Sequence, residues 1–205
     1  MEESLLRQAA KVLVPVFLAE IGDKTMLATA AFSLRTNPLL TLAVSALAYL
    51  AANSLPAILA SKAAEVLASH ASLVQAAAGA GFIAIGLSLL RGEREEFVVG
   101  RASSTFSYFL LLTLSEMGDK TQIATVLSAA LTANAPLTLL LGVTGYVLAN
   151  SVGVAAAYLA RSRLPAEALR RASAALFVVV GVLCMLTAVP QRAGTLVVPR
   201  LARRG

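Results

Sequence analysis

The chain consists of apolar runs, each about as long as a helix that crosses a bilayer, separated by short polar connections. A spanning helix needs about 20 apolar residues, and inside a bilayer only helices and closed barrels satisfy their backbone polar groups. Charged residues make up 14% of the chain, whereas a soluble domain has about 25%. We therefore expect an all-α integral membrane protein with six transmembrane helices, over residues 10–34, 39–60, 72–90, 105–131, 137–160 and 172–189.

The two halves of the chain repeat each other. The stretch Glu20-Ile21-Gly22-Asp23-Lys24-Thr25 recurs as Glu116-Met117-Gly118-Asp119-Lys120-Thr121. Further matched pairs are Asn37 with Asn134, Tyr49 with Tyr146, Asn53 with Asn150, and Phe82 with Phe177. Such self-similarity indicates an internal duplication. The expected organisation is a first three-helix repeat (residues 1–90), a charged connecting loop (91–104), a second three-helix repeat (105–190) and a basic tail (191–205).

Each repeat has an odd number of expected spans, so the second repeat must enter the membrane from the opposite side. Inverted-topology repeats are typical of secondary transporters, whose binding site lies near the middle of the membrane between the two halves. Outside the tail, Lys and Arg are more numerous on the side that holds the central connection. Because cytoplasmic loops carry an excess of Lys and Arg, this distribution favours both termini outside the cytoplasm.

Both copies of the motif place two acids and a base inside an apolar run. Ionisable groups in such surroundings cost several kcal/mol each unless they are paired or hydrated, so they need a partner or a function. On a continuous helix Glu20, Asp23 and Lys24 share one broad face, and the matched residues do the same. Gly22 and Gly118 would allow another backbone to come close, or allow local unwinding that exposes carbonyl oxygens.

If the two motifs meet, four carboxylates and two lysines leave two net negative charges, which balances one divalent cation or two protons. Carboxylate, hydroxyl and carbonyl oxygens suit hard ions such as calcium, magnesium and manganese. Neither motif has Cys or His nearby, which argues against zinc and copper. When the metal leaves, clustered carboxylates in a medium of low dielectric constant should take up protons. We therefore predict that the metal ligands are Glu20, Asp23, Glu116 and Asp119.

Seven other residues are expected to support this site: Lys24, Thr25, Lys120, Thr121, Gln122, Asn53 and Asn150. The two lysines either neutralise the acids, taking the place of the metal when it is absent, or extend toward water. The threonines would add hydroxyl oxygens, and the asparagines would either add amide oxygens or form hydrogen bonds between helices. Gln122 is a candidate oxygen ligand. Its counterpart Met26 offers a thioether, which either favours manganese or packs in the core.

The two motifs also allow other interpretations, one structural and two functional. Each Glu/Asp/Lys group could instead be a self-neutralising ion pair that fixes helix packing. A divalent cation channel or uniporter, and an exporter of an organic cation such as a basic amino acid, are the alternative functions. We do not expect an enzyme, because no His pairs with an acid and neither motif offers an activated nucleophile. The net charge of +6 lies mostly between the apolar runs, where the membrane surface explains it, so nucleic acid is not indicated as a partner.

Through its two complete motifs, EIGDKT (Glu20 to Thr25) and EMGDKT (Glu116 to Thr121), the sequence resembles a family of cation:proton antiporters with paired Glu-x-Gly-Asp-Lys/Arg-Thr/Ser motifs. This family includes Golgi calcium/manganese–proton antiporters and bacterial manganese exporters. The resemblance covers nearly the whole chain. It implies manganese or calcium transport against protons, with the motif acids as the binding site. Met26, where Gln would match the second copy, leaves the equivalence of the two half-sites open.

The expected protein is therefore a secondary active transporter that exports a divalent cation, manganese first and calcium second, in exchange for protons. Its partners would be the metal ion, protons and membrane lipid, with no cofactor. A short chain without an added N-terminal targeting region fits the inner (plasma) membrane of a prokaryote better than an organelle. Metal selectivity, proton stoichiometry and the formation of a homo-oligomer stay open at this stage.

Overall fold

The computed structural model describes residues 2–91, 102–160 and 166–188. Within these ranges the chain is all helical, without strands, which confirms the all-α prediction. Most of the charged connecting loop (91–104) and the whole basic tail (191–205) lie outside the described residues. The helices are α1 (Glu2–Glu20), α2 (Lys24–Ser33), α3 (Pro38–Val66), the short 3-10 helix η1 (Ala68–His70), α4 (Ala71–Arg91), α5 (Thr105–Glu116), α6 (Lys120–Thr132), α7 (Ala135–Ala160) and α8 (Ala166–Thr187).

Three stretches among the described residues are long and apolar enough to cross a membrane: Pro38–Val66, Ala68–Leu90 and Ala135–Leu159. A shorter apolar stretch covers Arg171–Thr187. The expected continuous helices over residues 10–34 and 105–131 are wrong. Each divides into two shorter helices, α1 with α2 and α5 with α6, which meet at the repeated motif.

The turns that join α2 to α3 and α6 to α7 are built alike. Asn37 caps α3 through its side-chain oxygen, which accepts hydrogen bonds from two backbone N–H groups, and the Asn134 side chain accepts one at the start of α7. Asparagine is favoured at this position because it satisfies N–H groups that have no partner inside the helix. Across each turn two threonine hydroxyls lie 2.8 Å apart, Thr36 with Thr41 and Thr132 with Thr138. The two halves of the chain therefore fold alike at these turns.

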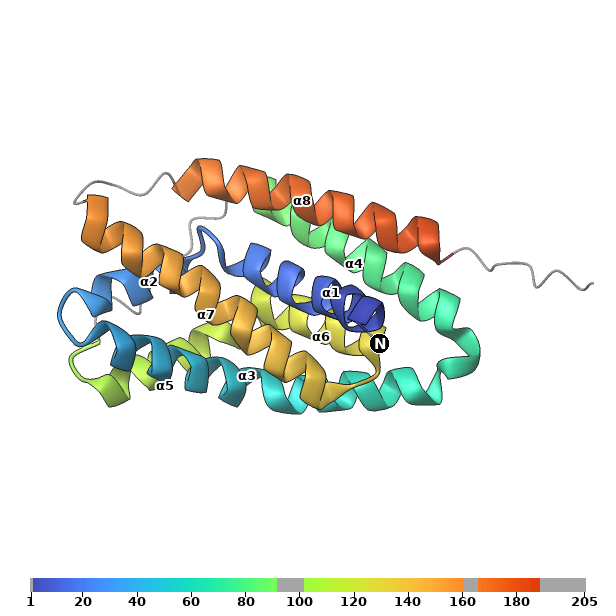
Figure 1. Ribbon diagram of the computed structural model, residues 1–205, viewed down its shortest axis with the longest axis horizontal. Coiled ribbons are helices and arrows are strands. Elements are labelled where there is room, and N and C mark those ends of the chain that lie inside the picture. The colour runs from blue at the N-terminus through green and yellow to red at the C-terminus, as the bar shows by residue number, and fades with distance from the viewer. Residues whose placement is uncertain (1, 92–101, 161–165, 189–205) are drawn as a thin grey trace, which may run out of the picture.

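Helices α4 and α8 lie side by side along one edge of the molecule (Figure 1). A Cβ atom on Gly79 would lie 2.7 Å from the carbonyl oxygen of Gly181, and one on Gly86 would lie 2.7 Å from that of Ala174. These contacts run in opposite order along the two helices, so α4 and α8 are antiparallel. Small residues at such positions let two membrane helices pack closely.

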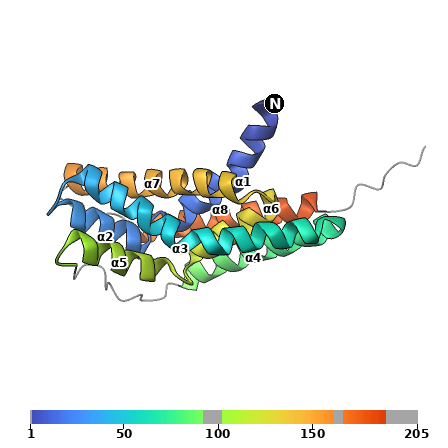
Figure 2. The ribbon, with the colours of Figure 1, turned by 90° about the horizontal axis from the view of Figure 1, so that it is seen from below.

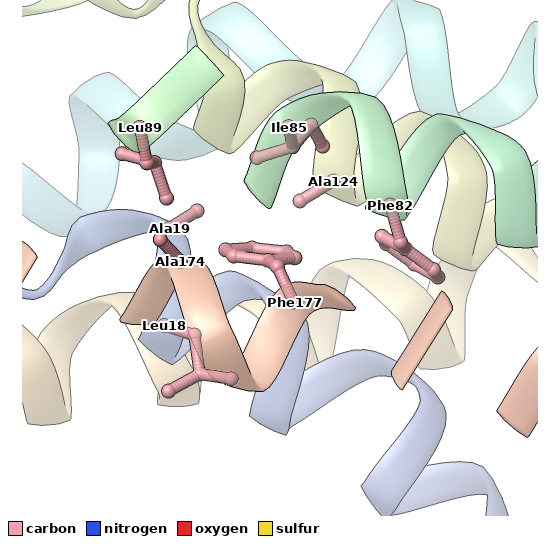
Figure 3. Packing of buried hydrophobic residues seen from close by; sticks show 8 residues of the cluster. All are labelled: Leu18, Ala19, Phe82, Ile85, Leu89, Ala124, Ala174 and Phe177. Atoms are coloured by element: carbon pink, nitrogen blue, oxygen red, sulfur yellow. The ribbon is translucent and has the colours of Figure 1, made fainter. Parts of the chain in front are cut away.

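The core between this helix pair and the motif helices is centred on Phe82 and Phe177, whose ring centroids are 6.0 Å apart. Figure 3 shows both rings among aliphatic side chains from α1 and α6. The cluster consists of Leu18, Ala19, Phe82, Ile85, Leu89, Ala124, Ala174 and Phe177. Two phenylalanines at matched positions therefore join the two halves of the chain.

The pair formed by α4 and α8 does not lie evenly over the two broken helices. Both views show α2 and α5 near one end of the molecule, with α4 and α6 displaced toward the other end (Figures 1 and 2). Helices α1 and α6 contribute Leu18, Ala19 and Ala124 to the core around α4 and α8. Ala28 of α2, which matches Ala124 of α6, packs instead with residues of α3 and α5. The packing of the two halves is therefore asymmetric.

Polar and apolar side chains are distributed as expected for helices in lipid. Large apolar side chains are exposed on the outside of the molecule, including Leu39, Val66, Leu73 and Leu159. In contrast, the side chains buried completely inside it include Glu20, Glu116, Asn53 and Asn150. In membrane proteins ionisable and polar residues face the interior of the bundle, because lipid cannot solvate them. These four residues belong to the repeated motifs and to the two longest helices.

Candidate functional site

Both copies of the motif interrupt a helix at the same place. Glu20 is the last residue of α1, Asp23 precedes α2, and the matched acids of the second motif occupy the same positions around α5 and α6. Between them, Gly22 (φ 75°) and Gly118 (φ 79°) adopt positive φ values that other L-residues rarely adopt. The prediction that Glu20, Asp23 and Lys24 share one face of a continuous helix is therefore wrong. Of the two roles expected for these glycines, local unwinding of the helix is confirmed.

Each motif aspartate lies at the start of the helix that follows it. Asp23 has an extended backbone (φ −81°, ψ 164°), and its carboxylate accepts a hydrogen bond from Thr25 N (3.5 Å). Asp119 has nearly the same backbone angles (φ −82°, ψ 168°) and accepts a hydrogen bond from Lys120 N (2.8 Å). The N–H groups at a helix start carry partial positive charge, so they stabilise a carboxylate there. The two breaks thus anchor two carboxylates inside the protein.

The aspartates and lysines of the two motifs form crossed ion pairs. Lys120 of the second motif pairs with Asp23 of the first. Lys24 Nζ of the first motif lies 3.9 Å from Asp119 Oδ2 of the second. A buried carboxylate needs such a counter-charge to offset the cost of losing its water. The lysines therefore link the two halves of the chain, because each aspartate forms an ion pair with a lysine of the other half.

Donors from three helices converge on Glu20, which is completely buried. Its Oε1 atom accepts hydrogen bonds from Thr25 Oγ1 (2.8 Å) and from Asn150 Nδ2 (3.0 Å). Its Oε2 atom accepts a longer hydrogen bond from Thr121 Oγ1 (3.3 Å). Because Thr25 follows Glu20 in one motif and Thr121 belongs to the other motif, Glu20 lies at the junction of both motifs with α7.

Glu116 is equally buried but has fewer partners. Its Oε1 atom accepts a hydrogen bond from the hydroxyl of Tyr146 (3.1 Å), and its Oε2 atom has no hydrogen-bond partner within the described part of the chain. A buried carboxylate oxygen without a donor is costly, because the lost water contacts are not replaced. Glu116 therefore presents an oxygen that a cation or a proton would satisfy.

Further oxygens around the site are also unsatisfied. Asn53 and Asn150 donate their amide groups to the backbone oxygens of Tyr49 (2.9 Å) and Tyr146 (3.0 Å) on their own helices. Both amide oxygens are buried without a hydrogen-bond partner among the residues described, and so is Oδ2 of Asp119, which faces the Lys24 ammonium only at 3.9 Å. Buried polar atoms in proteins are nearly always hydrogen-bonded. Carboxylate and amide oxygens of this kind are ligands of hard divalent cations.

The acids do not form a compact carboxylate cage. Among the described residues no three His, Cys, Asp or Glu side chains lie close enough together to hold a metal ion by themselves. The four motif acids instead belong to a network that includes lysine, threonine, asparagine and tyrosine side chains. A cation in this network would be shared between carboxylate oxygens and neutral oxygens, which suits ions that take six or more ligands.

Gln122 and Met26, which occupy matched positions, do not act alike. The Gln122 amide oxygen accepts a hydrogen bond from Gly118 N (2.9 Å), and its Nε2 donates to the Ala52 carbonyl oxygen (2.9 Å). Gln122 thus braces the second break against α3, and its oxygen is already used. Met26 is completely buried in a cluster with Ile21 and Ala149, which confirms the core-packing interpretation. The two half-sites therefore differ in chemistry.

Three buried tyrosines complete the site and were not predicted as part of it. Besides Tyr146, Tyr49 bonds the Thr125 hydroxyl and Tyr108 bonds the Thr29 hydroxyl, both at 2.8 Å. The rings of Tyr49 and Tyr146 are tilted against each other with centroids 4.9 Å apart. The sequence contained a signal for this pair, because the two tyrosines match between the halves. Tyr108 has no tyrosine at the matched position, so no such signal existed for it.

Comparison with known proteins agrees with this geometry. The family model described as "Divalent cation/proton antiporter GDT1" matches residues 8–97 and 104–192. No curated protein and no solved structure gave a significant match. The match covers most of the chain, and the family consists of transporters rather than enzymes. Together with its exposed apolar helices and buried acids, this match shows that the chain is a multi-pass membrane protein that belongs to the GDT1 family of divalent cation/proton antiporters.

Proposed function

We propose that the protein exchanges manganese, and with lower preference calcium, for protons at the site formed by the two motifs. Among the described residues five buried side-chain oxygens have no hydrogen-bond partner, one of which belongs to Ser128. The other four carry this proposal, since they lie on residues of the motifs or on the matched asparagines: Asn53 Oδ1, Glu116 Oε2, Asp119 Oδ2 and Asn150 Oδ1. Oxygen ligands favour hard cations, and manganese binds to carboxylate oxygens as well as to neutral amide oxygens. We assign Glu20, Asp23, Glu116 and Asp119 as the acids of the site.

The charges of the site support exchange between one metal ion and protons. Lys120 and Lys24 formally neutralise Asp23 and Asp119, which leaves Glu20 and Glu116 as the uncompensated acids. Two carboxylates in a water-poor interior hold either one divalent cation or two protons, because a net charge of −2 is unfavourable there. Binding of the metal therefore expels protons, and binding of protons expels the metal.

We further propose six spans in two inverted repeats of three. In this arrangement α1 with α2 and α5 with α6 each form one broken span, and α3, α4, α7 and α8 form the others. The antiparallel contact between α4 and α8, and the matched turns before α3 and α7, support it. Broken helices near the middle of the membrane are typical of transporters with inverted repeats, since unwound backbone is tolerated where it lines a polar site.

We assign the protein to the plasma membrane of a prokaryotic cell, where it would export the metal. An inward proton gradient supplies the energy for export, because each metal ion leaves as protons enter. The preference for manganese over calcium and the direction of transport rest on this chemistry and on the limited tolerance of cells for free manganese.

Proteoliposomes that contain a pH-sensitive dye test the exchange directly. We expect manganese uptake to be accompanied by proton efflux and to be lost in Glu116→Gln. Glu65→Gln serves as a matched control, since it removes an exposed acid at the end of α3, and should leave the flux unchanged. Manganese movement without a proton signal would indicate a channel or uniporter. Movement of a basic amino acid, with no flux of manganese or calcium, would indicate an organic cation exporter.

A further inference from the structure

Matched tyrosines of the two halves make different contacts. Tyr146 donates its hydroxyl hydrogen to Glu116 Oε1 (3.1 Å), whereas Tyr49 bonds the Thr125 hydroxyl (2.8 Å). Thr125 itself donates to the Thr121 carbonyl oxygen (2.8 Å), so Tyr49 is the donor in its contact. One tyrosine therefore holds a motif acid and its counterpart holds a threonine hydroxyl.

The amide and hydroxyl donors are divided just as unequally between the two glutamates. Asn150 donates to Glu20, and both motif threonines donate to Glu20 as well. Asn53, the counterpart of Asn150, donates to the backbone of its own helix, while Glu116 Oε2 lacks a hydrogen-bond partner among the described residues. The structure thus gathers donors on Glu20, although the sequence around Glu116 offers an equivalent set.

The burial of matched apolar residues shows the same asymmetry on a larger scale. Leu18 is 7% exposed, whereas the matched Leu114 is 58% exposed. Ile21 is 9% exposed, whereas the matched Met117 is 60% exposed. Leu18 packs in the core with α4 and α8, and Figure 1 shows these helices along the edge of the molecule opposite α5. Leu18 is therefore buried and Leu114 exposed because of where α4 and α8 lie, whereas Ile21 is buried by Met26 of α2 and Ala149 of α7.

A duplicated sequence whose halves adopt two different arrangements also encodes the state in which the halves exchange their arrangements. We propose that Tyr49 and Tyr146 are positioning residues that stabilise opposite states of the transport cycle. In the second state Tyr49 donates to Glu20, and Tyr146 turns from Glu116 to the Thr29 hydroxyl. The inference rests on the proposed exchange function, because it describes how Glu116 and Glu20 alternate, within one transport cycle, as the glutamate that a tyrosine contacts.

Movement of α4 and α8 accompanies this change of partners. In the second state the two helices leave α1 and α6 and pack against α5 and α2, so that Leu114 becomes buried and Leu18 becomes exposed. The exposed apolar area at Leu114 is then part of the surface onto which the helix pair moves. Because the packed interface is exchanged for an equivalent one, the two states can be close in free energy.

A local difference between the halves favours the state seen in the structure. Gly142 faces the hydroxyl of Tyr49, and a Cβ atom at Gly142 would collide with it. Ser45 stands at the matched position in α3, so the Tyr146 hydroxyl would meet a side chain there in the second state. Replacing Ser45 by glycine should therefore increase the population of the second state.

Two matched cysteine pairs can report the two states separately, in the full-length protein with Cys184→Ala. A Cβ atom on Gly81 of α4 would lie 2.7 Å from Leu127 Cδ1 of α6, so Gly81→Cys with Leu127→Cys should crosslink in the observed state. The matched positions are Leu176 in α8 and Ala31 in α2. Leu176→Cys with Ala31→Cys should crosslink only in the second state.

We expect the two phenylalanine substitutions to move the crosslinking yields in opposite directions. With manganese bound, so that Glu116 is ionised, Tyr146→Phe removes a bond to a charged group in the observed state and a bond to a neutral group in the second. The second state should therefore gain about 5-fold in relative population. Tyr49→Phe should shift the ratio by about 5-fold the other way, and the double substitution should return it toward the wild-type value. A merely structural role for the tyrosines predicts shifts in the same direction for both.

Either of two results would overturn the inference. One is a shift in the same direction for Tyr49→Phe and Tyr146→Phe. The other is the absence of the Ala31/Leu176 crosslink in all variants, including Ser45→Gly, which requires no loss of a buried tyrosine. Crosslinking measures conformation without transport, so its failure is distinguishable from that of the proposed function. Proton-coupled flux without the second crosslink contradicts only the inference, whereas exchange of crosslinks without proton-coupled flux contradicts only the function.

Discussion

The ammonium group of Lys120 forms an ion pair with the carboxylate of Asp23, which belongs to the other copy of the motif. Lys24 of the first motif and Asp119 of the second form the other ion pair between the two copies. Each motif aspartate therefore has a lysine partner from the other half of the chain, and these two ion pairs form only when both halves are together. Removal of one partner from a buried ion pair leaves an uncompensated charge, which costs more than the pair itself contributes.

Asp23→Asn and Lys120→Gln should each lower the thermal stability of the purified protein, because each leaves one buried charge without its partner. The double substitution should be less destabilised than the sum of the two single ones. We expect a coupling free energy of about 1–3 kcal/mol, as for other residues in one ion-pair network. Thermal unfolding in detergent of all four proteins in the cycle measures it.

The pair formed by Lys24 and Asp119 provides a matched control. Its charged atoms are 3.9 Å apart and its lysine side chain is 22% exposed, against 16% for Lys120. Greater distance and better hydration weaken an ion pair, so the Lys24→Gln/Asp119→Asn cycle should give a smaller coupling. Additive single effects at the Lys120–Asp23 pair would contradict the crossed arrangement.

Glu20→Gln and Glu116→Gln should both abolish exchange but differ in their effect on stability. Loss of residues that only orient a metal ligand typically costs about 10–100-fold, and loss of a ligand carboxylate should reduce metal flux by more than that. Both Glu20 oxygens accept hydrogen bonds, so the amide of a glutamine would face at least one donor. Glu116 has one oxygen without a partner among the described residues, which leaves room for an amide.

Flux in proteoliposomes and thermal unfolding of the same preparations check this pair of expectations. Glu20→Gln should have the lower unfolding temperature, and Glu116→Gln should stay close to the wild-type protein. Near wild-type flux in both variants would remove the two glutamates from the site. Equal destabilisation by the two substitutions would show that the hydrogen bonds to Glu20 do not distinguish the two acids.

Replacing either glycine at the helix breaks by alanine should lower the stability of the protein because of the backbone conformation alone. Gly118 has φ +79°, and among the described residues no atom lies within 4 Å of the place where a Cβ would be. Gly118→Ala should therefore destabilise by about 1–2 kcal/mol, the cost of a left-handed conformation in an L-residue. Gly22→Ala should behave similarly, since its φ of 75° is nearly the same.

Replacing Ala133 by glycine is a control that should change the stability in the opposite direction. Ala133 ends α6 with φ 48° and ψ 30°, a left-handed conformation that favours glycine. Ala133→Gly should stabilise the protein by about 1 kcal/mol. Thermal unfolding of the three variants measures these effects. Stabilisation by Gly118→Ala would show that the helix does not break at the motif as described.

Much of the candidate site could be predicted from the sequence because its motif occurs twice in the chain. The duplication identified Glu20 and Glu116 as matched acids, and the two threonines and asparagines as matched neighbours. The family match and the all-helical fold agree with that interpretation. The glycine inside each motif also indicated unwinding, although hydropathy alone favoured a continuous helix. A positive φ value is not visible in hydropathy, and this is why the expected helices over residues 10–34 and 105–131 were wrong.

Other features depend on tertiary contacts that a local pattern does not contain. The ion pair between Lys120 and Asp23 requires the two helix breaks to face each other. Sequence spacing does not specify which lysine pairs with which aspartate. The role of Tyr108 could not be predicted either, because its partner Thr29 is far away in the chain. The unequal burial of Leu18 and Leu114 has no basis in their local sequence at all. It follows from the position of α4 and α8 relative to the two breaks.

Isothermal titration of the purified protein with manganese, in two buffers of different ionisation enthalpy, tests most directly whether metal and protons compete for the same acids. Binding should release about two protons per metal ion, and the apparent affinity should weaken by as much as about 100-fold per pH unit as the pH falls. The proton release should decrease in Glu20→Gln and in Glu116→Gln. Manganese binding without proton release, with an affinity that does not depend on pH, would contradict an exchange of metal and protons at one site.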